Sequence, residues 1–456
     1  MARMRVGIAI VGGGLSGILC ALHFRAADPA LVISVIEKSD RFGPGLAYGA
    51  FATGHVLNVP VHRLDVGLSP TFEQWLATRV QTYDLGAALA EANGHLGEAF
   101  VGRSVFGEYL EDLLAPSLAS GVLQWIRTEA VAFLDEPRRG LRLADGTDLE
   151  AEGVILATGN EPPGAGPSDL EKAAGYIANP WAPDALAGIG ERDNVVALGT
   201  GLTAIDVVLA LRRQGHCGLI TLLSRRGQLP RPHEGGGQWP AFIDPHLPAS
   251  PAKLVRVVRQ EIRKAMMAGV PWPRVVDAVR PRITAIWSSW SLTERKAFLR
   301  HMRPWWDTVR HRMAPRIAAS IASQLEAGTL DVVAGRIVKW QADAGGICIG
   351  IDVRGVGPTR HVARHVINCT GPGTDVAELS APLLVDGLRR GLLTPDALRL
   401  GVETLSCAAV GADGQASRWL YGAGPMTRAE FWESTAVPEI QAQARMLAQR
   451  LCAPAY

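Results

Sequence analysis

A glycine-rich segment near the N-terminus has residue types and spacing suited to binding phosphate. Residues 12–17 read Gly-Gly-Gly-Leu-Ser-Gly, a G-x-G-x-x-G motif between the apolar run 5–11 and a helical pattern that reaches Ala27. The first glycine permits a tight turn, the second lets the backbone approach a pyrophosphate, and the third lets the helix pack on the strand. Unpaired N–H groups and a positive dipole at the helix N-terminus attract the phosphates.

An acid at the end of the next predicted strand completes this pattern. Glu37 follows the residues 32–36, about 20–25 residues after the glycines, where a carboxylate accepts the ribose hydroxyls of a dinucleotide. Strand, glycines, helix and acid together predict a dinucleotide site, whereas a glycine-rich turn alone is a weak signal. We assign this site, the first cradle, to Gly12, Gly14, Leu15, Ser16, Gly17, Glu37 and Lys38.

A second segment of the same type occupies the middle of the chain. The apolar run 195–198 is followed by a G-x-G-x-x-A motif at 199–204, and the next strand, 219–223, leads into Ser224-Arg225-Arg226. Arginines at this place suit the 2′-phosphate of NADPH, where an acid would favour NAD; a solvated strand end is the alternative. We assign this second cradle to Gly199, Gly201, Arg225 and Arg226, with NADPH as the expected cofactor and NADH as the alternative.

Two dinucleotide sites in one chain narrow the class of protein. Such a chain passes hydride from a nicotinamide to a flavin, so the first cradle is expected to bind FAD. The reduced flavin then delivers electrons to a disulfide, a quinone, a partner protein or oxygen. No two cysteines form a CxxC pair, which disfavours a redox-active dithiol and a zinc site; they are Cys20, Cys217, Cys348, Cys369, Cys407 and Cys452.

Composition limits the compartment and the partners. The chain has 456 residues, 48% hydrophobic and 20% charged, with a formal net charge of +2, so nothing points to nucleic acid. A membrane span needs about 20 apolar residues, and no stretch of that length lacks charges or glycine breaks. Isolated thiols fit a reducing compartment, and we predict a cytoplasmic protein without a membrane segment.

The rest of the chain alternates between sheet and helix patterns. Residues 124–149 and 331–366 alternate around turn signals, with Asp145-Gly146 as a hairpin turn, and lead into the tags Ala157-Thr158-Gly159 and Cys369-Thr370-Gly371. Residues 236–330 are rich in Trp, Arg and Pro and predict helices broken by prolines. We expect these helices over 251–268, 271–286, 292–300 and 305–325.

Several segments across nearly the whole chain resemble bacterial FAD/NAD(P)-binding proteins related to flavin-dependent monooxygenases. They are residues 41–49, 55–60, 154–159, 179–181, 199–206, 224–227, 310–315, 424–425 and 431–440. The resemblance implies an α/β fold with two dinucleotide-binding domains and a helical insertion. It implies an FAD-binding domain from 1–190 and 355–456, an NAD(P)H-binding domain from 191–235 and 326–354, and the insertion at 236–325.

The resemblance also implies roles for the tags and the C-terminal segment. Thr158, Gly159 and Gly371 would form tight backbone crossings beside the nucleotides. Gly424 would lie near the isoalloxazine, and a helix starting near Thr435 would aim its N-terminus at the flavin pyrimidine carbonyl. That dipole would stabilise the reduced flavin.

The implied activity is that of an NAD(P)H-consuming flavin monooxygenase acting on a small nitrogenous substrate with dioxygen. The specific expectation is hydroxylation of urate to 5-hydroxyisourate in purine catabolism. The alternatives are N-hydroxylation of an amine or amino acid, a flavin reductase feeding a partner protein, and a nucleotide-binding redox sensor without catalysis. The Baeyer–Villiger signature Phe-x-Gly-x-x-x-His-x-x-x-Trp does not occur in the chain.

Polar residues that could face such a substrate lie in three parts of the chain. Urate is an anion at neutral pH, so an Arg or His is expected beside it. Each candidate also has a structural alternative, such as a turn cap for His55 or a salt-bridged helix face for Arg312. We expect the catalytic residues to be His55, Asn58, His233 and Arg312, with His62, Arg63, Arg231, Arg303 and His311 as further candidates.

Overall fold

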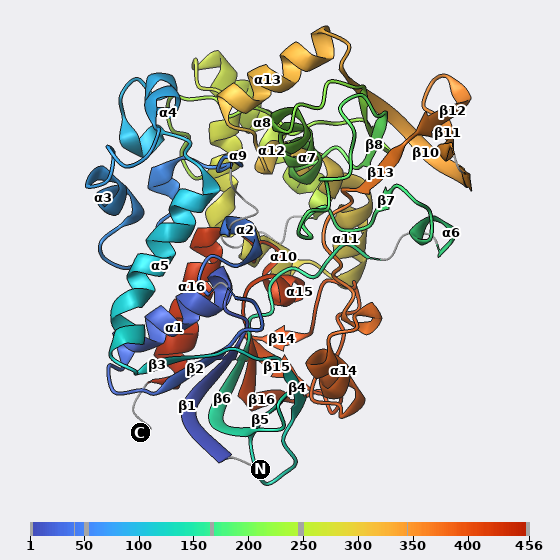
Figure 1. Cartoon of the computed structure of the whole chain (residues 1–456). Coiled ribbons are helices and arrows are strands. Elements are labelled where there is room, and N and C mark those ends of the chain that lie inside the picture. Colours follow the sequence, from blue (N-terminus) through green and yellow to red (C-terminus); the bar gives the residue numbers. More distant parts are fainter. Residues whose placement is uncertain are drawn as a thin grey trace.

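The chain forms two sheets joined by a helical insertion. The computed structural model describes residues 3–40, 42–49, 54–164, 168–244, 250–343 and 345–452, so Arg41 of the resembling segment 41–49 lies outside the described residues. Figure 1 shows the first sheet near both termini and the second at the opposite end of the molecule. No helix in the described ranges combines the length and the apolar character that crossing a bilayer requires.

The first sheet is mixed, with a parallel centre from β16 to β3, and its strands follow the order β14-β15-β16-β6-β1-β2-β3. Strand β1 pairs in parallel with both β2 and β6, and Ile10 lies level with Val35 and Ile155. The apolar runs predicted this, because strands of a parallel sheet are buried on both faces. The strands are β1 (Arg3–Val11), β2 (Ile33–Ile36), β3 (Leu123–Ile126), β4 (Ala130–Phe133), β5 (Gly140–Leu143), β6 (Asp148–Leu156), β14 (Thr404–Leu405), β15 (Ala408–Val410) and β16 (Ala416–Gly422).

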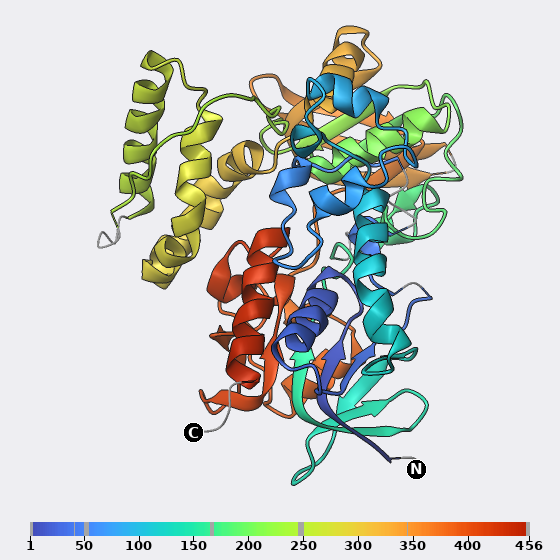
Figure 2. The same ribbon diagram turned by 90° about the vertical axis from the view of Figure 1, so that its left-hand side faces the viewer.

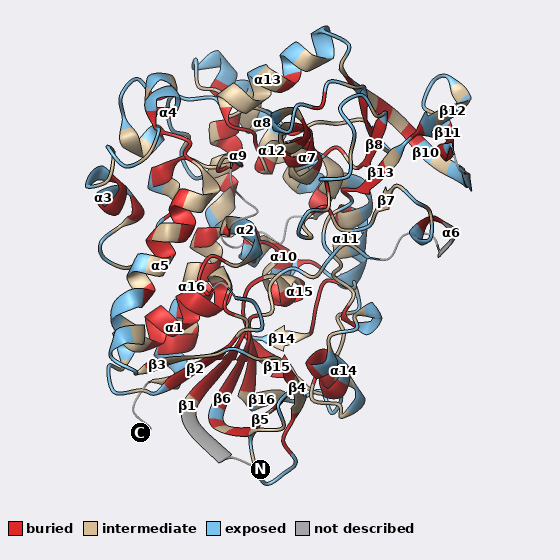
Figure 3. Cartoon of the chain, viewed as in Figure 1, coloured by how far each residue is buried: buried red, intermediate tan, exposed pale blue. Residues whose placement is uncertain are grey.

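Helices cover both faces of this sheet, and Figure 3 shows the described residues of its central strands β1, β2 and β6 mostly buried. Helices α1 (Leu15–Ala27), α5 (Arg103–Ala119) and α16 (Val437–Leu451) pack on one face, and α14 (Pro382–Arg389) packs on the other. Strands β5 and β6 pair antiparallel on either side of Asp145-Gly146, which confirms the predicted hairpin.

The second sheet has the order β12-β11-β10-β9-β8-β13-β7, with α7 (Leu202–Arg213) and α13 (Pro315–Glu326) packed against its parallel part. Strands β7, β12 and β13 belong to this sheet, although we had predicted their residues in the first domain. The cause is pairing: β13 hydrogen-bonds to both β8 and β7. We therefore propose that the second domain extends from before Tyr176 to after Asn368. Its strands are β7 (Tyr176–Ile177), β8 (Val195–Leu198), β9 (Ile220–Ser224), β10 (Leu330–Asp343), β11 (Gly346–Val353), β12 (Gly357–Ala363) and β13 (His365–Asn368).

The helical insertion stands to one side of the two sheets in Figure 2. The predicted helix 305–325 is wrong as a single element, because a proline lacks the N–H that a helix interior needs and Pro315 instead begins a new helix. The predicted helix 271–286 is likewise divided by a 3₁₀ turn at Arg280–Arg282. The elements are α8 (Pro251–Met267), α9 (Pro273–Val279), α10 (Ile283–Ser289), α11 (Leu292–Ala297), a π-helical turn (Phe298–Met302) and α12 (Arg303–Arg310).

Short helices connect these parts. They lie mostly in the first domain, between its second and third strands and near the C-terminus. They are α2 (Gly45–Tyr48), α3 (Phe72–Ala77), α4 (Gly86–Glu91), α6 (Ser168–Glu171), α15 (Arg428–Phe431) and the 3₁₀ turns Val61–Arg63, Leu96–Glu98, Val376–Glu378 and Gly424–Thr427.

Candidate functional site

The first cradle has the backbone geometry that a pyrophosphate requires. Gly12 has φ +106°, and a Cβ at this position would overlap with the Ala157 carbonyl oxygen. A Cβ on Gly17 would overlap with the Gly12 carbonyl oxygen, whereas a Cβ on Gly14 would meet only Gly45 Cα at 3.5 Å. Helix α1 begins at Leu15 without a side-chain cap, so its first N–H groups stay available. The residues present therefore fit a dinucleotide phosphate group.

Glu37 lies where the ribose of that dinucleotide is expected. Its Oε2 accepts a hydrogen bond from the Gly13 N–H at 2.8 Å, and its Oε1 accepts one from the Ser39 N–H at 2.7 Å. The carboxylate is thus fixed at the carboxyl end of β2, beside the glycines. Its neighbour Lys38 is exposed and forms an ion pair with Glu129 at 2.9 Å, which raises the pKa of Lys38.

The C-terminal segment closes the first cradle. Gly424 has φ +74°, and a Cβ here would overlap with the Ser16 hydroxyl at the start of α1. The Gly424 N–H donates to Gln443 Oε1 at 2.8 Å, on helix α16, which packs along α1. Thr435 precedes α16, whose first residue is Val437 and whose N-cap is Ala436. Both ends of the chain therefore build this cradle.

The second cradle repeats the geometry of the first. Gly199 has φ +127°, and a Cβ would overlap with the Cys369 carbonyl oxygen, just as Gly12 meets Ala157. A Cβ on Gly201 would meet nothing within 4 Å, and Ala204 is fully buried. The backbone at Gly201 is open to an approaching phosphate, so these residues also fit a dinucleotide.

The two tags reach their cradles in the same way. Each crosses a cradle at its first residue, Ala157 or Cys369, and then turns at a glycine with positive φ, +77° at Gly159 and +96° at Gly371. A Cβ on either glycine would meet nothing within 4 Å. Thr158 lies between the crossing and the turn, close to Gly12.

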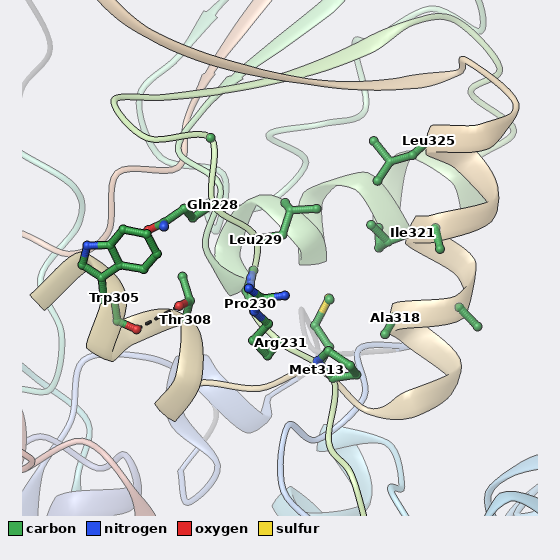
Figure 4. Close-up of a pocket in the computed structure, with 14 residues that line it drawn as sticks. Gln228, Leu229, Pro230, Arg231, Trp305, Thr308, Met313, Ala318, Ile321 and Leu325 are labelled. Atoms are coloured by element: carbon green, nitrogen blue, oxygen red, sulfur yellow. Dashed lines mark hydrogen bonds between the residues drawn. The ribbon is translucent and has the colours of Figure 1, made fainter. Parts of the chain in front are cut away.

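The arginines after β9 lie beside an apolar pocket. Arg225 is exposed, and the Arg226 guanidinium lies 5.9 Å from the ring centre of Trp305 on α12. The pocket has a volume of about 620 Å³ and lies between the loop after β9 and helices α12 and α13 (Figure 4). Its lining residues include Gln228, Leu229, Pro230, Arg231, Trp305, Thr308, Met313, Ala318, Ile321 and Leu325.

Three of the predicted catalytic residues, Asn58, His233 and Arg312, come from separate parts of the chain and lie close together. His233 Nε2 donates to the Asn58 carbonyl oxygen at 2.8 Å. Burial, together with Arg312 and Arg63, lowers the pKa of His233 to about 4, so the ring is neutral at pH 7. Arg312, which is 2% exposed, donates to Asp277 at 2.7 Å, and Arg63 reaches the same carboxylate at 3.1 Å.

Asp277 is the residue that the sequence interpretation missed. Arg274 also pairs with it, at 3.4 Å, so three guanidinium groups surround one carboxylate. Burial raises the pKa of Asp277, but Arg312 and Arg63 more than offset this and hold it at about 2. Arg312 Nη1 is buried and has no hydrogen-bond partner among the described residues. We name Arg63, Arg274, Asp277 and Arg312 the arginine cluster. The sequence feature that could have indicated Asp277 is its position as a single acid between Arg274 and Arg280 in a predicted helix.

His55 lies apart from this cluster. It is 6% exposed and packs edge-on against Trp181, with 5.6 Å between the ring centres. Its buried Nδ1 finds no hydrogen-bond partner in the part of the chain that the structure describes. Burial lowers the pKa of His55, the charge of Asp206 opposes this shift, and that of Arg103 adds to it. Those two residues form an ion pair of 2.8 Å between α7 and α5. His55 therefore lies at the contact between the two dinucleotide domains.

The remaining candidates do not join the arginine cluster. His62 is exposed and its Nδ1 lies 2.8 Å from the Gly97 carbonyl oxygen. Arg231 lines the pocket after β9, Arg303 pairs with Asp307 at 3.4 Å, and burial lowers the pKa of His311 to about 4. In the described part of the chain, no group of three or more His, Cys, Asp or Glu side chains could hold a metal ion.

Comparisons with known proteins agree with this geometry. Residues 9–161 match the model of a FAD-NAD(P)-binding family. An uncharacterised protein of Mycobacterium tuberculosis strain H37Rv is 24% identical over 98% of this chain and 95% of its own length. The reduced ornithine hydroxylase of Pseudomonas aeruginosa has a TM-score of 0.64 and 16% identity, covering 98% of this chain and 99% of that one.

Two further solved structures cover the same extent. The ornithine N-hydroxylase of Kutzneria sp. 744, with reduced FAD, NADP+ and L-ornithine, has a TM-score of 0.64 and 15% identity over 98% of this chain and 99% of its own. The FAD-bound cadaverine monooxygenase of Erwinia amylovora has a TM-score of 0.65 and 10% identity over 98% and 94%. The chain has the two-dinucleotide-binding flavoprotein fold. This confirms the predicted fold class.

Proposed function

We propose that the chain is a FAD-dependent, NADPH-consuming monooxygenase that N-hydroxylates the primary amine of a small molecule. The observation that carries this proposal is the pair of matching cradles within a fold shared, over 98% of the chain, with ornithine and cadaverine hydroxylases. The similarity to these proteins favours N-hydroxylation of an amine or amino acid, the alternative in the sequence analysis, over the hydroxylation of urate. Bound NADPH would supply hydride and bound FAD would activate dioxygen.

The chain's own residues would hold the two cofactors apart from bulk water and in fixed orientations. Gly12, Gly14 and the start of α1 would bind the FAD pyrophosphate, and Glu37 would accept the ribose hydroxyls. Gly199 and Gly201 would bind the NADPH pyrophosphate, and Arg225 and Arg226 its 2′-phosphate.

The arginine cluster supports a substrate that carries a negative group. Three guanidinium groups against one carboxylate leave an excess of positive charge, and Arg312 Nη1 has a donor to spare. A carboxylate would satisfy both. The cluster therefore supports an amino acid over a diamine as the substrate.

His233 is the group we propose for the substrate amine. A carbonyl oxygen only accepts, so the contact with Asn58 fixes the ring proton on Nε2 and leaves a lone pair on Nδ1. Nδ1 can then accept an N–H from the amine, while the positive charges of Arg312 and Arg63 would disfavour the ammonium form and so keep the amine neutral and nucleophilic. The residue lies within the electrostatic reach of Arg312 and Arg63, beside the proposed carboxylate site.

A substrate screen tests the proposal. Purified protein with FAD is mixed with NADPH and, separately, ornithine, lysine, cadaverine or urate, and both NADPH oxidation and the product mass are followed. We expect an amine to stimulate oxidation and to gain one oxygen atom per NADPH consumed. Stimulation of NADPH oxidation by urate and by no amine would refute an amine substrate in favour of urate. Hydrogen peroxide as the only product with every compound would refute a monooxygenase activity.

A further inference from the structure

The segment that leads into α16 adopts a strained backbone conformation held by the helical insertion. Trp432 is 4% exposed and has φ +60°, which is rare for a bulky residue. Its ring stacks on Trp287 of α10 at 4.9 Å, and the Trp287 indole N–H donates to the Ala429 carbonyl oxygen at 2.8 Å. Such strain persists only where the surroundings enforce it.

A buried ion pair holds the next residue of the same segment. Arg310 Nε donates to Glu433 Oε2 at 2.7 Å, and their side chains are 6% and 9% exposed. The Trp306 indole N–H donates to the other oxygen of Glu433 at 2.9 Å. Helix α12 of the insertion therefore supplies a hydrogen-bond donor to each oxygen of this carboxylate.

Directly after Glu433 lies a polar group without a partner. The Ser434 side chain is fully buried, and its hydroxyl has no hydrogen-bond partner among the described residues. Helix α16 follows at Val437, with no side-chain cap on its first N–H groups. A buried hydroxyl and an uncapped helix start side by side indicate that something polar belongs against them.

The position of the start of α16 relative to the first cradle points to one end of a bound dinucleotide as this polar group. Gln443 hydrogen-bonds to Gly424, which sits against Ser16 of the cradle. From Gln443 back to Val437 is six residues of α16, or about 9 Å of helix at 1.5 Å per residue. Figures 1 and 2 show α16 beside α1, so a dinucleotide anchored at the cradle can extend along α16 towards its N-terminus.

We propose that Arg310 and Glu433 are positioning residues for the flavin: their ion pair fixes Ser434 and the start of α16 against the pyrimidine end of FAD and tunes its reduction potential. The inference rests on the proposed function, since it needs FAD in the first cradle. Reduction places negative charge on the flavin. Arg310 therefore favours the reduced state and Glu433 opposes it.

Measuring the reduction potential of the bound flavin in two single variants tests this. R310Q leaves the negative charge of Glu433 unpaired, so the potential should become more negative than that of the wild type. E433Q removes the negative charge nearest to Arg310 and leaves only the longer contact with Glu439 at 3.7 Å, so the potential should become more positive. A merely structural role would loosen the same segment in both variants, and shifts of the same sign, or none, would overturn the proposal.

A matched control variant and a second pair of variants separate the effect of these charges from a general loss of folding. E91Q removes one charge from the Arg316–Glu91 ion pair of 3.1 Å, which joins α13 to α4, and should leave the potential unchanged. If the buried variants do not fold, R280Q and E439Q replace them, because this pair, at 2.9 Å, holds the first turn of α16 and is partly exposed. Opposite shifts are again expected, negative for R280Q and positive for E439Q, and equal signs overturn the proposal.

The same measurement separates this inference from the proposed function. The potentials are read on protein-bound FAD and do not require a substrate. Opposite shifts in a protein that hydroxylates no amine would support the positioning role and refute the proposed activity alone. A wild-type protein that binds no FAD would overturn both.

Discussion

The two cradles share one backbone design but differ in their surroundings. Each has a first glycine pressed against a crossing tag and a second glycine open to a ligand. The first cradle is closed by Gly424 against Ser16, whereas a Cβ on Gly201 of the second would meet none of the described residues within 4 Å. The acid Glu37 follows the first and the arginines 225–226 follow the second. We therefore expect backbone shape to set where phosphates bind, and we propose that the strand ends and the cover distinguish a resident cofactor from one that exchanges.

The last residue of each motif, Gly17 in the first cradle and Ala204 in the second, gives the sharpest test of this comparison. G17A should prevent FAD binding, because a Cβ on Gly17 overlaps with the Gly12 carbonyl oxygen and neither backbone can move without opening the turn. We expect loss of the bound-flavin absorbance and a lower melting temperature. The control is G188A, an exposed glycine whose Cβ would meet nothing within 4 Å. Retention of FAD by G17A at the wild-type level would contradict the assignment of the first cradle.

A site built from charged side chains should respond to pH, unlike either backbone cradle. The pKa of Asp277 is about 2 in the folded chain against an ordinary 3.8, so its ion pairs stabilise the fold by about 2 kcal/mol above pH 4. That contribution is lost as the pH falls from about 4 towards 2. D277N should therefore lower stability by about 2 kcal/mol at pH 7 and by progressively less below pH 4.

Chemical denaturation of wild type and D277N between pH 7 and pH 3 measures this difference. As the control, D112N alters the more exposed Arg79–Asp112 pair, which has side chains 39% and 50% exposed, and should change little at any pH. A gap between wild type and D277N that stays constant down to pH 3 would show that the arginine cluster does not hold Asp277 ionised.

The strand ends offer a smaller effect that sharpens the comparison. Replacing both Arg225 and Arg226 with alanine should raise the KM for NADPH by at least about tenfold to a hundredfold, because even a single hydrogen bond to a charged group contributes about 1.5–3 kcal/mol. The KM for NADH, which lacks the 2′-phosphate, should change far less. R259A, on the exposed face of α8, is the control. Equal effects on the two nucleotides would refute the 2′-phosphate assignment.

The sequence predicted both cradles, the tags and the hairpin because each is a local pattern with one structural solution. Gly12 needs positive φ and Gly17 needs contact with a neighbouring strand, and both demands appear as glycine at fixed spacing. The arginine cluster and the pairs of Arg310 and Arg280 join residues far apart in the chain, and nothing in the spacing of broken helices sets their partners. Strand β13 was misplaced for the same reason, since pairing with β8 is a long-range choice.

The smallest expected effect comes from making the second cradle more like the first. A204G replaces the last residue of the second motif with glycine and should cost about 1 kcal/mol of stability, because glycine is unfavourable inside a helix. Ala204 is fully buried, whereas the backbone at Gly201 is open, so the KM for NADPH should stay within about twofold. Steady-state kinetics and thermal unfolding measure the two quantities. A large rise in the KM for NADPH would contradict this expectation. It would mean that the Ala204 methyl group sets the spacing of α7 and β8 that phosphate binding needs, so that the two cradles differ in helix packing as well as in cover.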